Sequence, residues 1–289
     1  MSASPTTTPV LVRAAGVDVL RRAGLHGGTP VVLLHGVGSN ASSFAPLMQA
    51  LDPSLDVYAW DAPGYGASKP LAMASPHPSD YADALADVLD ALELGRVILV
   101  GHSLGSLFAG SFAATRPARV AALALLSPAL GYRVATGGAL PPNVQSRIDD
   151  LEQLGPQAFA ASRAARLVHS PETKPEVLAR VRSAMAALNP AGYAQAVRAL
   201  GHGDLLADAT RISAPTSVAI GAEDAVTPPA GARALHATLI HPRGYQEFAA
   251  TGHALPQEAP IAARSHFPPS ARRSSCHYQQ NYRDLPRAP

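Results

Sequence analysis

The chain has little cysteine, little net charge and no long apolar run, and each shortage excludes a class of protein. The single cysteine among 289 residues, Cys276, excludes an intramolecular disulfide and multi-cysteine zinc sites and favours a reducing compartment. A formal net charge of +2, without clustered Lys and Arg before the C-terminal tail, excludes a nucleic-acid-binding surface. No apolar run approaches the roughly 20 residues that cross a bilayer, so we expect no membrane partner. The first residues lack a basic region followed by an apolar one, and we therefore expect no secretory signal and a cytoplasmic location.

What the chain does have is enough apolar sequence for one large core. Hydrophobic residues make up 47% and charged residues 15%, which is typical of a globular protein. Short apolar runs alternate with segments of helical periodicity, including one from Ser79, a possible N-cap, to Leu94. This alternation predicts an α/β fold with a doubly wound, mostly parallel sheet. The predicted strands are a hairpin, Val10–Val12 with Val17–Val19, and the runs Pro30–Leu34, Leu55–Trp60, Val97–Val100, Val120–Leu126, Thr216–Ile220 and Tyr245–Ala249.

The alternation stops between residues 130 and 210. This stretch holds helical segments with no strand between them, broken near Gly155 and Pro156. We predict a helical lid at 130–210, inserted into a core formed by 1–129 and 211–263. Residues 264–289 lose all apolar periodicity and are expected to be poorly ordered.

The motif Gly101-His-Ser103-Leu-Gly105 follows one buried strand and precedes a helix. A serine on so sharp a turn has a strained backbone, and the glycines on both sides make room for it. The spacing G-x-S-x-G in this setting predicts that Ser103 is an exposed nucleophile. The alternative is a tight turn in which the serine only caps the helix.

A serine nucleophile needs a base and an orienting carboxylate. His253 lies in a glycine-containing loop just after the last predicted strand, and Asp224 follows the strand after the insert. Parallel strands bring both loops to the same edge of the sheet as Ser103. Glu223 and Asp204 are rival carboxylates; Asp204 is the weaker because it precedes its strand.

Attack on a carbonyl also requires N–H groups for the oxyanion that develops. The backbone N–H of Leu104, at the start of a helix, is one predicted donor, and the N–H of Val37 is the other. Gly36 and Gly38 allow the Val37 loop to turn inward. We expect His35 to bond loop backbone rather than substrate.

Together these motifs resemble the α/β-hydrolase superfamily. The resemblance rests on His35-Gly36, on Asp61-Ala-Pro-Gly-Tyr-Gly-Ala-Ser68, on the serine motif, and on Asp224 and His253 in the chain order of that superfamily. The stretch Asn189-Pro-Ala-Gly-Tyr193, leading into Ile212-Ser-Ala-Pro-Thr216, is similar to 3-oxoadipate enol-lactonases and related lactonases and esterases. That resemblance implies no metal or organic cofactor and small anionic lactone substrates. Arg133, Arg163, Arg166 and Arg198 are candidates to face the substrate carboxylate, and the alternative for each is a solvated arginine on the lid surface.

The C-terminus departs from this family. Members close with an amphipathic helix after the histidine, whereas Pro256–Ala263 begins such a helix and prolines soon break it. This departure bears on stability more than on catalysis.

The sequence thus predicts an enzyme that cleaves a carboxylic ester or lactone of a small molecule through an acyl-enzyme on Ser103. A C–C hydrolase of a vinylogous diketone and a non-catalytic ligand-binding protein of this fold are the alternatives. An aspartate-nucleophile dehalogenase or epoxide hydrolase is disfavoured by the serine itself. The oligomeric state is left open.

Overall fold

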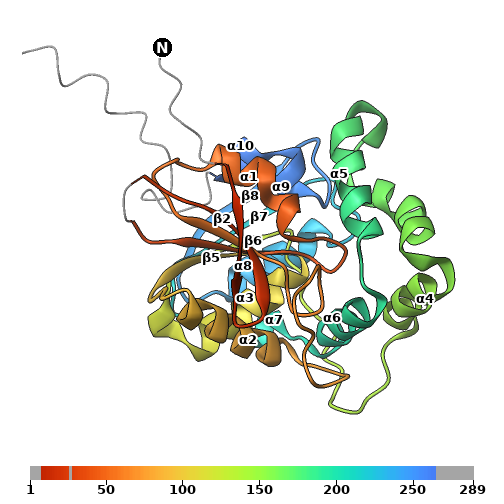
Figure 1. The fold of residues 1–289 in the computed structure, drawn as a ribbon, viewed down its shortest axis with the longest axis horizontal. Helices are drawn as coiled ribbons and strands as arrows, with labels where there is room; N and C mark the ends of the chain where they lie inside the picture. Colours follow the sequence, from red (N-terminus) through yellow and green to blue (C-terminus); the bar gives the residue numbers. More distant parts are fainter. Residues whose placement is uncertain (1–7, 26–27, 265–289) are drawn as a thin grey trace, which may run out of the picture.

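The computed structural model describes residues 8–25 and 28–264, and its centre is an eight-stranded sheet (Figure 1). The strand order is β1-β2-β4-β3-β5-β6-β7-β8. The hairpin β1/β2 and the pair β2/β4 are antiparallel, and all other neighbours are parallel. The strands are β1 Val10–Ala14, β2 Val17–Arg22, β3 Val31–Leu34, β4 Val57–Trp60, β5 Val97–His102, β6 Val120–Leu126, β7 Thr216–Gly221 and β8 Pro242–Phe248.

The continuous apolar runs of the central strands arise because helices cover both faces of the sheet. In β5, Val97 and Leu99 join one apolar cluster, whereas Ile98 and Val100 join the other on the opposite face. One face is covered by α2 Pro78–Ala91, α3 Leu104–Thr115 and α8 Pro229–Thr238. The other is covered by the 3-10 turn η1 Ala41–Phe44, α1 Ala45–Ala50, α9 Leu255–Glu258 and α10 Pro260–Ala263. The predicted doubly wound, mostly parallel α/β sheet is confirmed.

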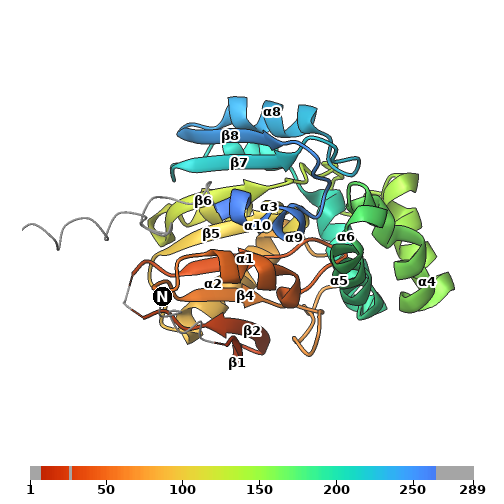
Figure 2. The ribbon, with the colours of Figure 1, turned by 90° about the horizontal axis from the view of Figure 1, so that it is seen from above.

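The stretch between β6 and β7 is helical, and most of it lies to one side of the sheet (Figure 2). It contains α4 Pro142–Arg163, the 3-10 turns η3 Ala164–Leu167 and η4 Pro171–Thr173, then α5 Pro175–Ala186, α6 Pro190–His202 and α7 Leu205–Ala209. Helix α4 bends at Gly155, whose φ is 71°, and Pro156 follows it without an N–H to donate. Helix α6 meets the loop after β4 so closely that a Cβ on Gly192 would lie 1.9 Å from Gly64 O.

Two helix ends differ from what the sequence predicts. Ser79 is not the N-cap of α2: the helix begins one residue earlier at Pro78, and His77 is its cap, its N–H donating to Asp80 Oδ2 over 2.6 Å. The predicted helix after His253 is two short helices, α9 and α10, because Ala259 between them has a non-helical conformation, with a φ of −135° and a ψ of 53°. The expected disorder of the tail concerns residues that, apart from Arg264, lie outside the described part.

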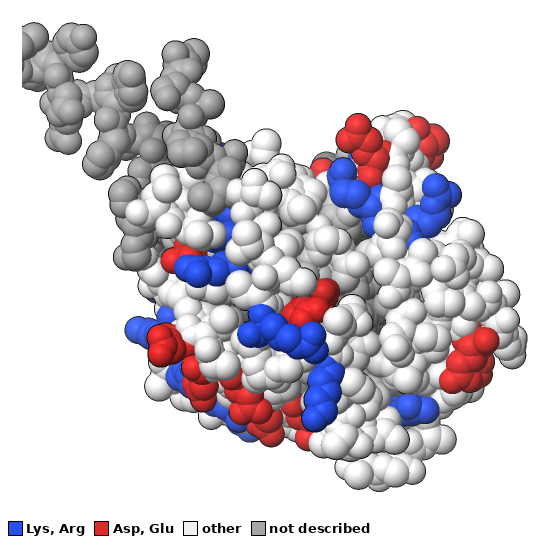
Figure 3. Space-filling model, viewed as in Figure 1, with Lys and Arg blue, Asp and Glu red and all other residues white. Residues whose placement is uncertain are grey.

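Charged side chains of both signs are interspersed on the face shown in Figure 3, and they include a group over α5 of the helical insert. Among the described residues several charged side chains form ion pairs, for example Arg119 with Asp90 and Arg21 with Asp56. None of the helices within residues 8–25 and 28–264 combines the length and the apolar character that crossing a bilayer requires.

Candidate active site

Ser103 lies on the sharp turn between β5 and α3, with a φ of 53° and a ψ of −117°. Such a conformation costs a non-glycine residue about 1–3 kcal/mol and persists only where the surroundings enforce it. They do so through close backbone contact: a Cβ on Gly105 would lie 2.0 Å from Leu34 O, and one on Gly101 would lie 2.5 Å from Gly105 O. The two glycines therefore let α3 start directly against β3 and hold the serine at the strand end.

Two hydrogen-bonding contacts connect Ser103 to His253 and His253 to Asp224. Nε2 of His253 is 3.0 Å from Ser103 Oγ, and Nδ1 of His253 is 2.9 Å from Asp224 Oδ2. The three residues are only 6%, 4% and 3% exposed. With the ring proton on Nδ1, His253 donates to the carboxylate and its Nε2 accepts the serine proton. This is the arrangement a general base requires.

Asp224 stays ionised in spite of its burial. Burial by itself would raise the pKa of this carboxyl, but the charge and hydrogen bond of His253, helped by backbone N–H groups, outweigh it and lower the pKa to about 2. The N–H groups of Val226 and Thr227 each donate to Oδ1 over 2.9 Å, and the Thr227 hydroxyl lies 2.9 Å from Oδ2. Thr227, which the sequence analysis did not single out, thus helps to hold the carboxylate.

The rival carboxylates lie elsewhere. Glu223 is exposed, and its Oε2 accepts the N–H of Thr251 over 2.9 Å. Asp204 caps α7 by accepting the N–H of Ala207. Neither contacts His253, so of the three acidic residues considered only Asp224 reaches the imidazole.

His102, the variable residue inside the serine motif, contacts the loop of His253. Its Nε2 lies 2.8 Å from the backbone oxygen of His253 and donates to it. Burial, reinforced by the neighbouring charge of His253, lowers the pKa of His102 to about 3, so the ring is neutral at pH 7. Sequence reasoning missed this contact because no local pattern indicates a bond to a residue 151 positions away.

The predicted oxyanion donors flank Ser103. Leu104 is the first residue of α3, where N–H groups have no partner within the helix. The Val37 loop comes so close that a Cβ on Gly36 would lie 2.9 Å from Ser103 Cβ. Val37 O accepts the Tyr65 hydroxyl over 2.7 Å, whereas the Val37 N–H donates to none of the described residues. As expected, His35 bonds only backbone: Nδ1 donates to Gly36 O, and Nε2 accepts from Ala62 N.

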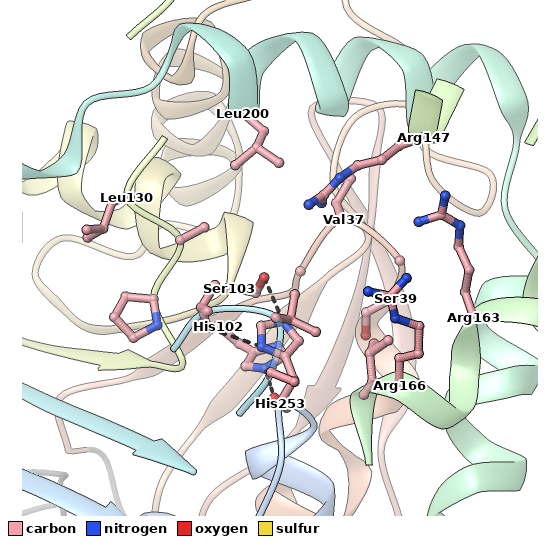
Figure 4. A pocket seen from close by; sticks show the side chains of 18 of the residues that line it. Val37, Ser39, His102, Ser103, Leu130, Arg147, Arg163, Arg166, Leu200 and His253 are labelled. Carbon is pink, nitrogen blue, oxygen red and sulfur yellow. Dashed lines mark hydrogen bonds between the residues drawn. The ribbon is translucent and has the colours of Figure 1, made fainter. Parts of the chain in front are cut away.

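A cavity of about 540 Å³ opens above Ser103, and the helical insert supplies much of its lining. Leu130 and Leu200 lie on one side of this cavity, and Arg147, Arg163 and Arg166 lie together on the other (Figure 4). The remaining lining is largely apolar, with Phe159, Met185 and Tyr193 among its side chains.

Only one of these three arginines has an ionic partner among the described residues. Arg163 pairs with Asp150 and lies over the Phe159 ring. Neither of the other two arginines forms a hydrogen bond or ion pair with a described residue. Arg147 is half-buried and Arg166 is exposed to solvent. The cavity wall therefore carries an excess of positive charge.

Two arginines singled out from the sequence do not line the cavity. Arg133 lies 3.8 Å from Asp204, and Arg198 donates to Ala74 O on the surface. Arg147 was not considered, because its direction depends on how α4 is rotated against the core. Within the described ranges, no group of three His, Cys, Asp or Glu side chains is arranged to hold a metal ion.

Comparison with known proteins shows the family to which this fold belongs. A family model described as the alpha/beta hydrolase fold matches residues 29–260. The chain belongs to the α/β hydrolase fold family. It is 33% identical over 199 residues to the (E)-2-((N-methylformamido)methylene)succinate hydrolase of Acinetobacter baylyi. The aligned residues cover 68% of this chain and 73% of that relative. It is 31% identical over 217 residues to the pimeloyl-[acyl-carrier protein] methyl ester esterase of Chromobacterium violaceum, or 73% and 82% of the two chains.

A solved structure of an enol-lactonase from Burkholderia xenovorans has the same fold. It superposes with a TM-score of 0.77 at 24% identity, over 89% of this α/β hydrolase and 97% of that chain. The predicted superfamily, fold class and enzyme class are thereby confirmed, since the relatives are named as a hydrolase and an esterase.

Proposed function

We propose that this α/β hydrolase cleaves a carboxylic ester or lactone of a small molecule through an acyl-enzyme on Ser103. The observation that carries the proposal is the series of contacts from Ser103 Oγ through His253 to Asp224, at 3.0 and 2.9 Å, at the floor of the cavity. A buried serine needs such a base to become nucleophilic, and the base needs an ionised partner.

The reaction follows from these positions. His253 Nε2 takes the proton of Ser103 as Oγ attacks the carbonyl carbon, and the oxygen that becomes negative accepts the N–H groups of Val37 and Leu104. The imidazolium, stabilised by Asp224, returns the proton to the leaving alkoxide. Water then gives a proton to His253 and attacks the acyl carbon. The imidazolium passes this proton to Ser103 Oγ as the bond between Oγ and the acyl carbon breaks, which releases the acid and restores the free serine and the neutral base. No step requires a metal or organic cofactor.

We propose further that residues 130–210 act as a lid over this cavity, on a core formed by 1–129 and 211–263. Support comes from Phe159, Met185 and Leu200, which belong to the insert and line the cavity that contains Ser103. A water-poor cavity strengthens every electrostatic interaction with the reacting carbonyl.

The preferred substrate in this proposal carries a carboxylate. Arg147 and Arg166 line the cavity without an ionic partner among the described residues, and a guanidinium forms its strongest hydrogen bonds with a carboxylate. The succinate hydrolase relative, named for a dicarboxylate, and the resemblance to lactonases support the same substrate class.

Hydrolysis of a panel tests the proposal. The panel contains p-nitrophenyl esters of increasing chain length, small lactones, monoesters of dicarboxylic acids and a vinylogous diketone, each with wild type and Ser103→Ala. The matched control is Ser111→Ala, because Ser111 is also buried in α3 but does not line the cavity. We expect hydrolysis of esters or lactones that only Ser103→Ala abolishes. Activity confined to the diketone would replace the proposal by C–C hydrolysis, and a folded but inert wild type would favour ligand binding.

A further inference from the structure

Glu258, at the end of α9, has a carboxylate with no exposed surface and three hydrogen-bond donors around it. Oε1 accepts the N–H of Gly252 over 3.0 Å. Oε2 accepts the N–H of His169 over 3.1 Å and the ammonium of Lys174 over 2.7 Å. A buried carboxylate is tolerated when charge and hydrogen bonds compensate it in this way, and it becomes costly when they are removed.

These donors come from two parts of the chain that meet only in the folded protein. Gly252 directly precedes His253, whereas His169 and Lys174 belong to the insert, between η3 and α5. The buried carboxylate of Glu258 therefore connects two segments, the loop that contains His253 and the helical insert.

Two further bonds connect the same segments on either side of His253. The N–H of Ala254 donates to Leu167 O over 2.8 Å, and Lys174 Nζ donates to Ala250 O over 2.7 Å. The backbones also touch, since a Cβ on Gly252 would lie 2.7 Å from the nitrogen of His169. The residues before and after His253 are thus held by the insert, while its ring contacts Ser103 and Asp224.

We propose that Glu258 and Lys174 are positioning residues, which hold His253 in line with Ser103 by joining its loop to the insert. The proposal rests on the proposed function of Ser103 and His253. A general base acts well only when it is held in place, and a displacement of about 1 Å can lower the rate on the order of 100-fold. The insert would then take part in building the active site in addition to covering it.

The test compares Glu258→Gln and Lys174→Met with Glu176→Gln. The amide of Glu258→Gln turns an N–H group toward one of the three donors, and Lys174→Met removes the charge opposite the buried carboxylate. Glu176 is the matched control because it is an acidic residue of the same region, exposed and paired only loosely with Arg180 at 4.0 Å. Each variant is studied well below its melting temperature.

The first measurement is the rate at which a fluorophosphonate labels Ser103 Oγ, a reaction that releases fluoride and needs the serine proton to be taken up by the base. We expect Glu258→Gln to lower this rate on the order of 10- to 100-fold, Lys174→Met to lower it less, and Glu176→Gln to leave it unchanged. With an ester substrate, kcat should fall while KM changes little, because the base acts in the transition state. Unchanged labelling in both variants, even with lower melting temperatures, would overturn the proposal and leave these residues a structural role.

A second measurement does not depend on activity. The proton on His253 Nδ1, hydrogen-bonded to Asp224, should give a low-field proton NMR signal that shifts or broadens in Glu258→Gln and stays unchanged in Glu176→Gln. If wild type is not labelled at all, the proposed serine hydrolysis fails, and the positioning proposal is decided by this signal alone. A signal identical in wild type and both variants would overturn it. If Glu258→Gln does not fold, Lys174→Met, which keeps both backbone bonds of Glu258, decides the question.

Discussion

His253 donates from Nδ1 to Asp224 Oδ2 over 2.9 Å, and this bond decides which ring nitrogen faces the serine. Because the proton is held on Nδ1, Nε2 is free to accept from Ser103. In the proposed mechanism, the role of the carboxylate is therefore to fix the tautomer of the base.

Asp224→Asn should keep the fold and lose most of the activity. The amide does not stabilise the imidazolium and favours the wrong tautomer, so we expect kcat to fall on the order of 10⁴-fold with little change in KM. Steady-state kinetics on an ester that wild type hydrolyses measures this loss. Glu223→Gln is the control, since Glu223 is adjacent but contacts only backbone near His253. Equal losses in the two variants would contradict the assignment of Asp224.

Arg147→Met should weaken the binding of carboxylate-bearing substrates alone. Charge-assisted hydrogen bonds contribute about 1.5–3 kcal/mol, so KM for a monoester of a dicarboxylic acid should rise about 10- to 100-fold. For the corresponding neutral diester, KM should change little. Arg198→Met, on the surface outside the cavity, should alter neither value. A parallel loss on both esters would mean that Arg147 acts by packing and not by charge.

His102 should make the protein less stable as the pH falls. Its pKa is about 3 in the folded state, below the ordinary value of about 6.5, so between these values the unfolded chain binds a proton that the folded chain does not. The contribution of this group is complete above pH 6.5 and decreases by about 1.4 kcal/mol per pH unit toward pH 3.

Urea unfolding at pH 4, 5, 6 and 7 measures this effect as a difference between wild type and His102→Gln. The glutamine amide can still donate to His253 O but does not titrate. The wild type should therefore lose stability relative to the variant as the pH is lowered. If the difference in unfolding free energy between wild type and His102→Gln is constant across this range, His102 takes up its proton as readily in the folded protein as in the unfolded chain. That result would contradict a neutral His102 in the folded protein.

Gly105→Ala should prevent the close contact between α3 and β3. The new Cβ would lie 2.0 Å from Leu34 O, a backbone atom of a central strand, so one of the two elements must move. We expect a loss of more than about 3 kcal/mol of unfolding free energy, or no folded protein. Gly95→Ala is the control, because nothing lies within 4 Å of its Cβ, and it should change stability by less than about 1 kcal/mol. Thermal melting of both variants checks the contrast.

Much of the fold was predictable because the sheet is covered on both faces. A strand such as Val31–Leu34 must be apolar at every position when alternate side chains enter two separate clusters, and this leaves a pattern that can be read locally. The apolar strands also showed where Ser103, Asp224 and His253 lie, since each residue follows a strand end. Parallel strands end at one edge of the sheet, so the three residues could be expected to meet there. The N-cap of α2 was predicted two residues too late, at Ser79 instead of His77, because the pattern did not take into account that Pro78 suits the first helical position.

The succession of strands and helices along the chain, the serine turn and the residue types after each strand could be predicted from the sequence, because these depend on neighbours in the chain. Only the tertiary structure decided which arginines face the cavity, that His102 bonds His253 O, and that Glu258 joins Gly252 to His169. Such contacts depend on how α4 rotates against the core and on how loops far apart in sequence approach one another. No periodicity records those distances, since packing between elements fixes them only after each element has formed.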